Sequence, residues 1–153
     1  MSLAGPDSWL SEWSRNKIFF SAFWAWFLAQ TIKVVLGVFR EKRFNFRWFV
    51  GSGGMPSSHA ALTAGLATAT GFYYGFDSGL FALAVGFCVI TMFDAQGVRR
   101  QSGHQAGALN KILDDLYAQK GIQPERLKEL FGHTPVEVFA GTFLGIVVAL
   151  LYY

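Results

Sequence analysis

Four long apolar segments constrain the fold of this chain more than any other feature. A helix needs about 20 mainly apolar residues to cross the hydrocarbon core of a bilayer. Four segments approach that length without a run of charge, at residues 17–39, 58–76, 79–96 and 135–153. Hydrophobic residues make up 52% of the 153 residues, more than a soluble domain of this size needs. The sequence predicts one all-α domain over residues 1–153, an integral membrane bundle of about four transmembrane helices.

Basic residues gather in the two longer connections between these segments. If all four segments cross the membrane, both connections lie on one face, here called the loop face, and the chain ends lie on the other. The loop face then carries Arg40, Lys42, Arg43, Arg47, Arg99, Arg100, Lys111, Lys120, Arg126 and Lys128, against Arg15 and Lys17 opposite. Because positive loops favour the cytoplasm, we expect a multi-pass protein of the cell membrane with a cytoplasmic loop face.

The second connection contains a helical pattern of its own. Apolar residues recur at Leu109, Ile112, Leu113 and Leu116, while charged residues fill the other side. This spacing predicts an amphipathic helix near residues 105–120, lying on the membrane surface. Packing against the loop-face end of the bundle is equally compatible with the pattern.

Two cations lie at the loop-face end of the first segment. Lys33 falls inside the apolar run, where a lone charge is costly and suggests a site. Arg40 follows two helical turns later, about 10 Å along the axis and on nearly the same helix face. The alternative is that Lys33 extends to the headgroups and Arg40 only ends the helix.

A glycine-rich loop leads directly into the second segment through Pro56, Ser57, Ser58 and His59. The free amides and the positive dipole end of the predicted helix point to the loop face, which favours an anion there. Helix capping explains the two serines equally well. His59 has little structural purpose in the first turn of a membrane helix and is a functional candidate.

The third segment leaves the membrane through Asp94, followed by Arg99 and Arg100. Arginine suits bidentate phosphate binding, and Asp94 either orients a cation or forms a structural ion pair. The fourth segment opens with His133, Thr134 and a Glu137 that completes a capping box. Glu137 can serve the cap, bind His133, or do both. Topology brings all of these residues to the loop face.

Taken in order, three short motifs resemble those of a known superfamily. They are Lys33 and Arg40 with six residues between them, then residues 56–59, then His133 with Glu137 four positions on. These resemble the signature motifs of the type 2 phosphatidic acid phosphatase (PAP2) superfamily, which includes vanadium haloperoxidases and bacterial acid phosphatases. Residues 53–61, 94–100 and 132–145 are most similar to its divergent branch of small membrane proteins.

The chain departs from the superfamily pattern at four positions. Glu41 stands where the first motif has proline, Ser58 where the second has glycine, and Glu137 where the third has aspartate. Leu127 stands where the third motif has arginine, a role that we assign to Arg99 or Arg100. His104 is a rival for the third-motif histidine, but no acid follows it at the required spacing, so we expect a surface residue.

The resemblance implies that His133 attacks phosphorus, that His59 protonates the departing lipid oxygen, and that Glu137 fixes the tautomer of His133. The phosphate would be held by Lys33, Arg40, Ser57, Ser58 and Arg99 or Arg100, with Asp94 in support. No metal or cofactor is expected. Four spans are fewer than the six usual in membrane members, and a homodimer is one way to complete the pocket. Gly141 and Gly145 are spaced for such a contact, although small residues also pack within a monomer.

The expected function is a metal-independent lipid phosphate phosphatase that acts through a phosphohistidine on a membrane phosphomonoester, such as phosphatidylglycerol phosphate, or on a diphosphate. The expected partners are this substrate and membrane lipids, with no nucleic acid. The main rival is a non-catalytic phospholipid-binding or membrane-assembly protein, which would need neither histidine. An anion transporter ranks last, because the middles of the last three segments are almost uncharged.

Overall fold

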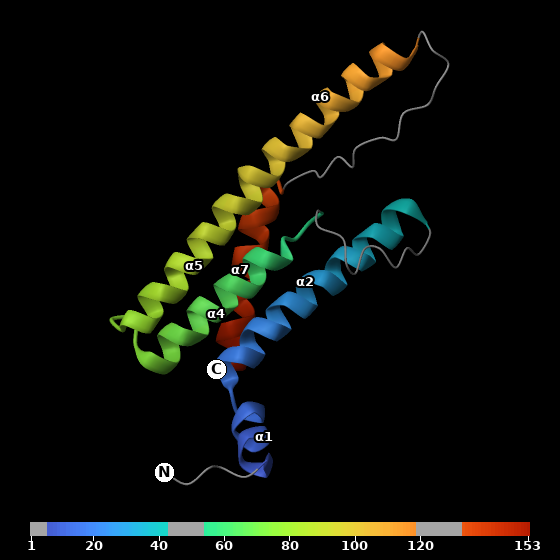
Figure 1. The fold of residues 1–153 in the computed structure, drawn as a ribbon. Helices are drawn as coiled ribbons and strands as arrows, with labels where there is room; N and C mark the ends of the chain where they lie inside the picture. Colours follow the sequence, from blue (N-terminus) through green and yellow to red (C-terminus); the bar gives the residue numbers. More distant parts are fainter. Residues whose placement is uncertain (1–5, 43–53, 119–132) are drawn as a thin grey trace.

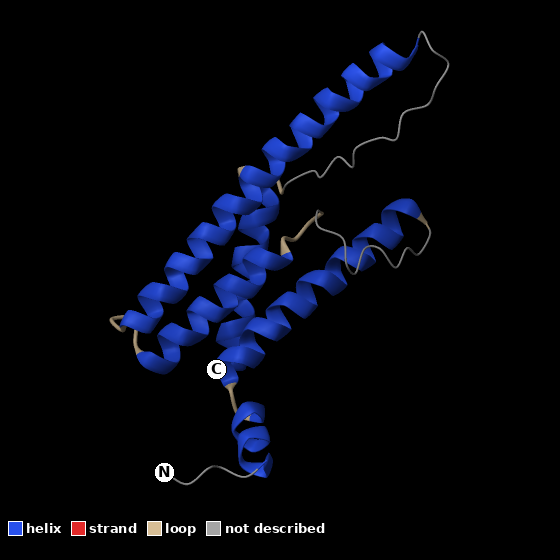
Figure 2. Cartoon of the chain, viewed as in Figure 1, coloured by secondary structure: helices blue, strands red, loops and turns tan. Residues whose placement is uncertain are grey.

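The computed structural model describes residues 6–42, 54–118 and 133–153, and every regular element in these ranges is a helix (Figure 1). The elements are α1 (Pro6–Ser14), α2 (Lys17–Glu41), α4 (Ser58–Tyr74), α5 (Gly79–Gln96), α6 (Val98–Ala118) and α7 (Pro135–Tyr152). Figure 2 shows the same helices joined by short loops within the described ranges. The predicted all-α bundle is confirmed.

Helix α4 lies at the centre of the bundle and packs against α2, α5 and α7. Its buried face consists of small residues, among them Ala60, Ala61 and Ala64. Small side chains let helices approach closely. Inside lipid the hydrophobic effect does not drive helices together, so the van der Waals contacts of this close packing hold them instead. At Gly65 an added Cβ would lie 3.1 Å from the Cβ of Ala25 on α2. The α2–α4 contact therefore depends on the absence of side-chain bulk.

Two glycines of α7 make an equally close contact with α4. A Cβ on Gly141 would collide with the carbonyl oxygen of Ser57, and one on Gly145 would collide with the carbonyl oxygen of Ala61. Both glycines are buried. Of the two uses that their spacing allowed, the structure shows packing within one chain, which fixes the start of α7 against the start of α4.

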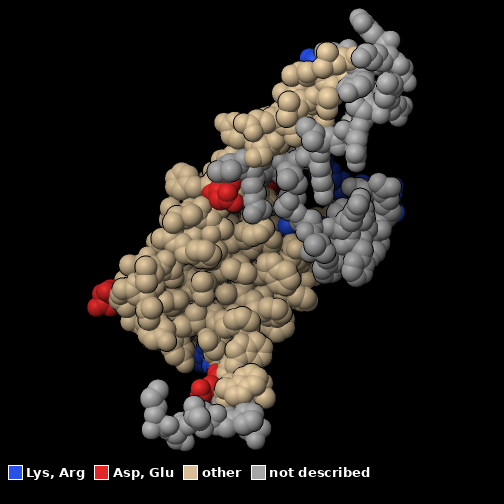
Figure 3. All heavy atoms as spheres, in the orientation of Figure 1, with Lys and Arg blue, Asp and Glu red and all other residues tan. Residues whose placement is uncertain are grey.

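The outer surface of the bundle is apolar. Large hydrophobic side chains such as Leu83, Phe93 and Phe139 are more than 70% exposed. Three helical stretches of the described chain, Lys17–Arg40, Gly79–Asp114 and Pro135–Tyr152, are long and apolar enough to cross a membrane. In the view of Figure 3, the Lys, Arg, Asp and Glu side chains gather toward the ends of the bundle and leave an uncharged side between them. This distribution is that of a membrane protein.

Helices α1 and α6 lie outside the four-helix packing. The sequence reading did not anticipate α1, whose Trp13 ring lies 5.3 Å and 5.5 Å from the rings of Phe19 and Phe20 on α2. One residue, Gly97, separates α6 from the end of α5, so α6 begins earlier than the predicted start near residue 105, and it continues beyond the bundle (Figure 1). Within the described ranges it packs on α5 alone. Its position on a membrane surface stays a prediction.

Candidate functional site

The first turn of α7 is built by its own sequence. Thr134 is the N-cap, and its hydroxyl accepts a hydrogen bond from the Glu137 amide at 3.4 Å. Oε2 of Glu137 accepts one from the Thr134 amide at 3.0 Å, which completes the predicted capping box. Pro135 fits the first helical position because that position needs no amide donor.

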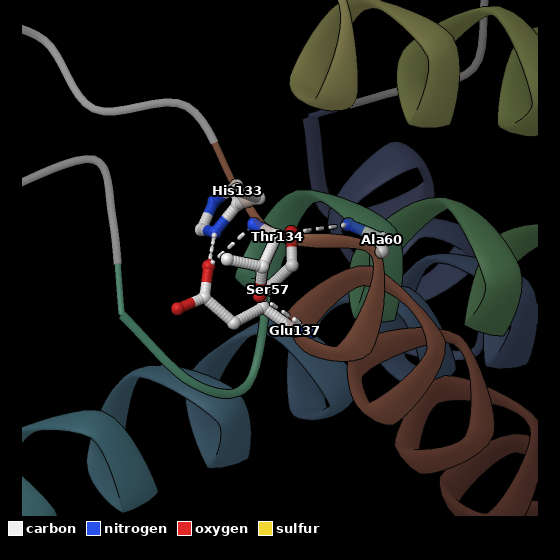
Figure 4. A network of polar contacts seen from close by, with 5 residues as sticks. All are labelled: Ser57, Ala60, His133, Thr134 and Glu137. Atoms are coloured by element: carbon white, nitrogen blue, oxygen red, sulfur yellow. Dashed lines mark hydrogen bonds and ion pairs between the residues drawn. The ribbon is translucent and has the colours of Figure 1, made fainter. Parts of the chain in front are cut away.

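The same carboxylate also contacts His133. Nδ1 of His133 lies 3.0 Å from Oε2 of Glu137, so one oxygen serves both the cap and the imidazole (Figure 4). A carboxylate oxygen can only accept, so Nδ1 carries a proton, and in the neutral imidazole Nε2 then keeps its lone pair. His133 is 2% exposed, which places this pair in a buried setting. The two roles weighed for Glu137 therefore coexist.

Main-chain hydrogen bonds fix His133 relative to two other helices. Its amide donates to the carbonyl of Ala95 in the last turn of α5 at 3.1 Å. The amide of Ser57 donates to the carbonyl of Glu137 at 2.9 Å. The end of α5 and the starts of α4 and α7 thus meet at one place. Sequence reasoning missed Ala95, because a carbonyl acceptor leaves no mark on residue type.

The two serines before and in α4 are buried. Ser57 is the N-cap of α4, and its Oγ accepts from the Ala60 amide at 3.4 Å. The capping role weighed for Ser57 is therefore present in the structure. Ser58 is 3% exposed at the first position of the helix. His59 follows it and is exposed at the same end of the bundle.

Lys33 joins this cluster from α2. It is 8% exposed, and a Cβ placed on Gly54 would lie 3.4 Å from its Cγ and 3.6 Å from its Cδ. The φ of Gly54 is +87°, a conformation in which glycine is favoured, so the loop can pass close to the lysine stem. Glu137 attracts the Lys33 ammonium electrostatically. Lys33 is thus turned into the bundle end, which disfavours the alternative in which it extends to the headgroups.

For the other predicted site residues, the structure gives the position in a helix. Arg40 is exposed in the last turn of α2, and Asp94 is half-buried in the last turn of α5, next to Ala95. The backbone places Arg99 and Arg100 in the first turn of α6, directly beyond α5, but their side chains lie outside the described part of the structure. Further predicted loop-face residues also lie outside it, namely Gly51, Ser52, Gly53, Arg43, Arg47, Lys120, Arg126, Leu127 and Lys128. His104 is exposed on α6, as expected of a surface residue.

The described site combines an oriented buried imidazole, a buried cation and the start of a helix. An ammonium and helix amides favour a negatively charged group, and an imidazole with a free-base Nε2 is a nucleophile or a general base. Within residues 6–42, 54–118 and 133–153, no three His, Cys, Asp or Glu side chains are grouped as metal ligands. The arrangement suits phosphate chemistry carried by protein side chains.

Comparison with known proteins places these features in a family. The model of the divergent PAP2 family matches residues 14–148, which include all the site residues named above. A relative from Bacillus subtilis (strain 168), described as "Uncharacterized membrane protein YuiD", is 40% identical over 134 residues, covering 80% of this chain and 85% of that protein. No solved structure matches the chain. With a match over most of its length, the chain belongs to the divergent PAP2 family.

Proposed function

We propose that this chain is a multi-pass lipid phosphate phosphatase whose nucleophile is His133. The contact of 3.0 Å between Nδ1 of His133 and Oε2 of Glu137 carries the proposal. An imidazole held by a carboxylate on one nitrogen is fixed in the tautomer whose other nitrogen can attack. The capping box alone would not require a histidine at this position, because the carboxylate closes the box with the Thr134 amide.

The proposed reaction has two steps. Nε2 of His133 forms a bond to phosphorus as the bond to the lipid oxygen breaks, and His59 gives a proton to that oxygen. Water then attacks the phosphohistidine, His59 takes a proton from the water, and phosphate leaves. Glu137 stabilises the positive charge that His133 acquires in the first step. Exposed His59 at the start of α4 is accessible to water, as the second step requires.

Cations would neutralise the charge on the transferring phosphoryl group. Lys33, buried beside Gly54 and attracted electrostatically by Glu137, would be the first of these cations. Arg40 and one of Arg99 and Arg100 would complete the set, together with the first-turn amides of α4 near Ser57 and Ser58. Asp94 would orient one of these guanidinium groups. These groups supply the charge that a metal ion provides in other phosphatases.

The proposed substrate is a lipid phosphate of the cytoplasmic leaflet. The sides of the bundle are apolar and suited to lipid, so a substrate would enter the site from the membrane surface. The positive charge of the loops favours a cytoplasmic position for this end of the bundle. A phosphomonoester such as phosphatidylglycerol phosphate presents the two features that the site would select, a terminal phosphate and a membrane anchor. A lipid diphosphate has the same features and is the second substrate class.

The test is phosphate release by the purified chain in detergent from a panel of lipid monophosphates and diphosphates. The wild type is compared with His133→Ala, His59→Ala and His104→Ala, the last being a matched control because His104 is exposed on α6. We expect turnover in the wild type and the control and its loss in the other two variants. Trapped phosphate on a residue other than His133, found by mass spectrometry, would contradict the nucleophile assignment.

One observation favours a second function, a non-catalytic phospholipid-binding protein. His133 is only 2% exposed, as expected for a structural histidine that locks the start of α7. In that case the folded wild type binds vanadate or lipid phosphate but releases no phosphate from any lipid. Binding would then survive His59→Ala and weaken on Lys33→Met.

A further inference from the structure

A groove lies at the end of the bundle opposite the candidate site. It has a volume of about 450 Å³ and is formed by the α1–α2 junction and the last turns of α4. Helix α7 begins at the candidate site and ends near this region, so the length of a membrane-spanning helix separates the two (Figure 1). The groove is therefore independent of the proposed phosphatase chemistry.

The mouth of the groove is basic. Arg15 and Lys17 line it, with Glu12 as the acid in the lining, which leaves an excess of one positive charge. Lys17 is held in place, since its Nζ lies 3.5 Å from the carbonyl oxygen of Tyr153 and 6.0 Å from the centroid of the Tyr153 ring. Arg15 is exposed and can turn toward a ligand. These are the two cations that the sequence places on this membrane face.

The wall of the groove is apolar and aromatic. Ile18 and Phe19 of α2 line it together with Leu66, Tyr73 and Tyr74 of α4. Both tyrosines are more than half exposed. Tyrosine is typical of the membrane interface, where its ring is in contact with lipid and its hydroxyl with headgroups. Leu66 is two helical turns from Tyr73, so the wall extends about 10 Å from the edge of α4 toward its middle.

A basic mouth with an apolar wall of this depth fits one class of ligand. A phosphate group would pair with the charges of Arg15 and Lys17. An acyl chain would make apolar contacts with Ile18 and Leu66. A water-soluble phosphate would leave the wall empty, and a zwitterionic lipid would bring its own cation to a basic mouth. We propose that this groove binds an anionic phospholipid from the leaflet opposite the candidate site.

The test is native mass spectrometry of the full chain in detergent, titrated with phosphatidylglycerol or with phosphatidylcholine of the same acyl chains. We expect the wild type to bind phosphatidylglycerol more tightly, and Arg15→Gln with Lys17→Gln to lower that affinity about tenfold, since each basic residue near a membrane surface contributes a few-fold. Lys111→Gln, which removes an exposed cation on α6 at the other end of the molecule, is the matched control and should leave the affinity unchanged.

Lys17→Gln removes the contact with Tyr153 and could loosen this end of the chain, so Arg15→Gln alone is the second variant. It should weaken phosphatidylglycerol binding by a few-fold with no change in the thermal unfolding midpoint. Glycerol phosphate, which has the charge without the chains, should not compete. Equal affinity for the two lipids overturns the proposal, as does an equal loss in the Lys111→Gln control, which would indicate diffuse attraction. Competition by glycerol phosphate would show a site for free phosphate and refute the lipid assignment.

Discussion

Replacing Glu137 with glutamine removes a charge while keeping an acceptor at the same place. Oε2 of Glu137 accepts from Nδ1 of His133 and from the Thr134 amide, both at 3.0 Å. The glutamine amide oxygen can keep both contacts as neutral hydrogen bonds. What is lost is the charge that stabilises His133 when it becomes cationic on phosphorylation.

The size of the effect follows from the two kinds of hydrogen bond. A bond to a charged group contributes about 1.5–3 kcal/mol and a neutral one about 0.5–1.5 kcal/mol, so the difference is about 1–1.5 kcal/mol. If that difference is expressed in the transition state, kcat falls roughly tenfold. Glu137→Ala removes the acceptor as well, so it should abolish turnover and also destabilise the fold by about 1 kcal/mol through loss of the cap.

The assay is kcat for phosphate release at saturating lipid, measured beside the thermal unfolding midpoint of each variant in the same detergent. We expect Glu137→Gln to lose activity at nearly unchanged stability, and Glu137→Ala to lose both. Full activity in Glu137→Gln would show that the carboxylate serves only the helix start. A stability loss equal to that of Glu137→Ala would show that the acceptor geometry is not kept, and the argument from charge would fail.

Three further predictions concern packing, metal and topology. Gly141→Ala should destabilise the fold by about 1–3 kcal/mol because its Cβ would collide with the carbonyl of Ser57, whereas Gly86→Ala meets no atom within 4 Å and should be neutral or stabilising in thermal unfolding. Phosphate release should persist in EDTA and be blocked by vanadate, and loss of activity on chelation with recovery on adding a divalent metal would contradict a metal-free site. A cysteine at Lys111 should react with an impermeant maleimide only after cells are permeabilised, whereas one at Asp77 should react in intact cells; the reverse pattern would invert the orientation.

The helices of the bundle could be predicted from the sequence because apolar length is a direct signal for a bilayer. The start of α7 could also be predicted, because the threonine, proline and glutamate of a capping box occupy fixed positions relative to one another in the sequence. The offset of four residues also put His133 and Glu137 within reach of one another. Sequence spacing therefore predicted the His133–Glu137 pair and the capping box, which both lie at the start of α7.

The rest depends on contacts between distant segments, which local patterns do not record. The central position of α4 follows from its small residues, although at 17 residues it is the shortest of the four bundle helices in the structure. The close packing of Gly141 on Ser57 was one of two uses that the glycine spacing allowed. The burial of Lys33 beside Gly54 brings together residues of two different segments. The sequence alone could not decide between this burial and extension of Lys33 to the headgroups.

The bonds that join α4, α5 and α7 at the site run from main chain to main chain. Because the Ala95 carbonyl and the Ser57 amide exist whatever side chains those residues carry, these two bonds do not themselves depend on residue type. An alanine scan would therefore leave these main-chain bonds in place. Only proline, which lacks the amide, would break the bonds donated by Ser57 and His133. The links between α4, α5 and α7 are thus encoded in the course of the main chain, where a comparison of residue types does not detect them.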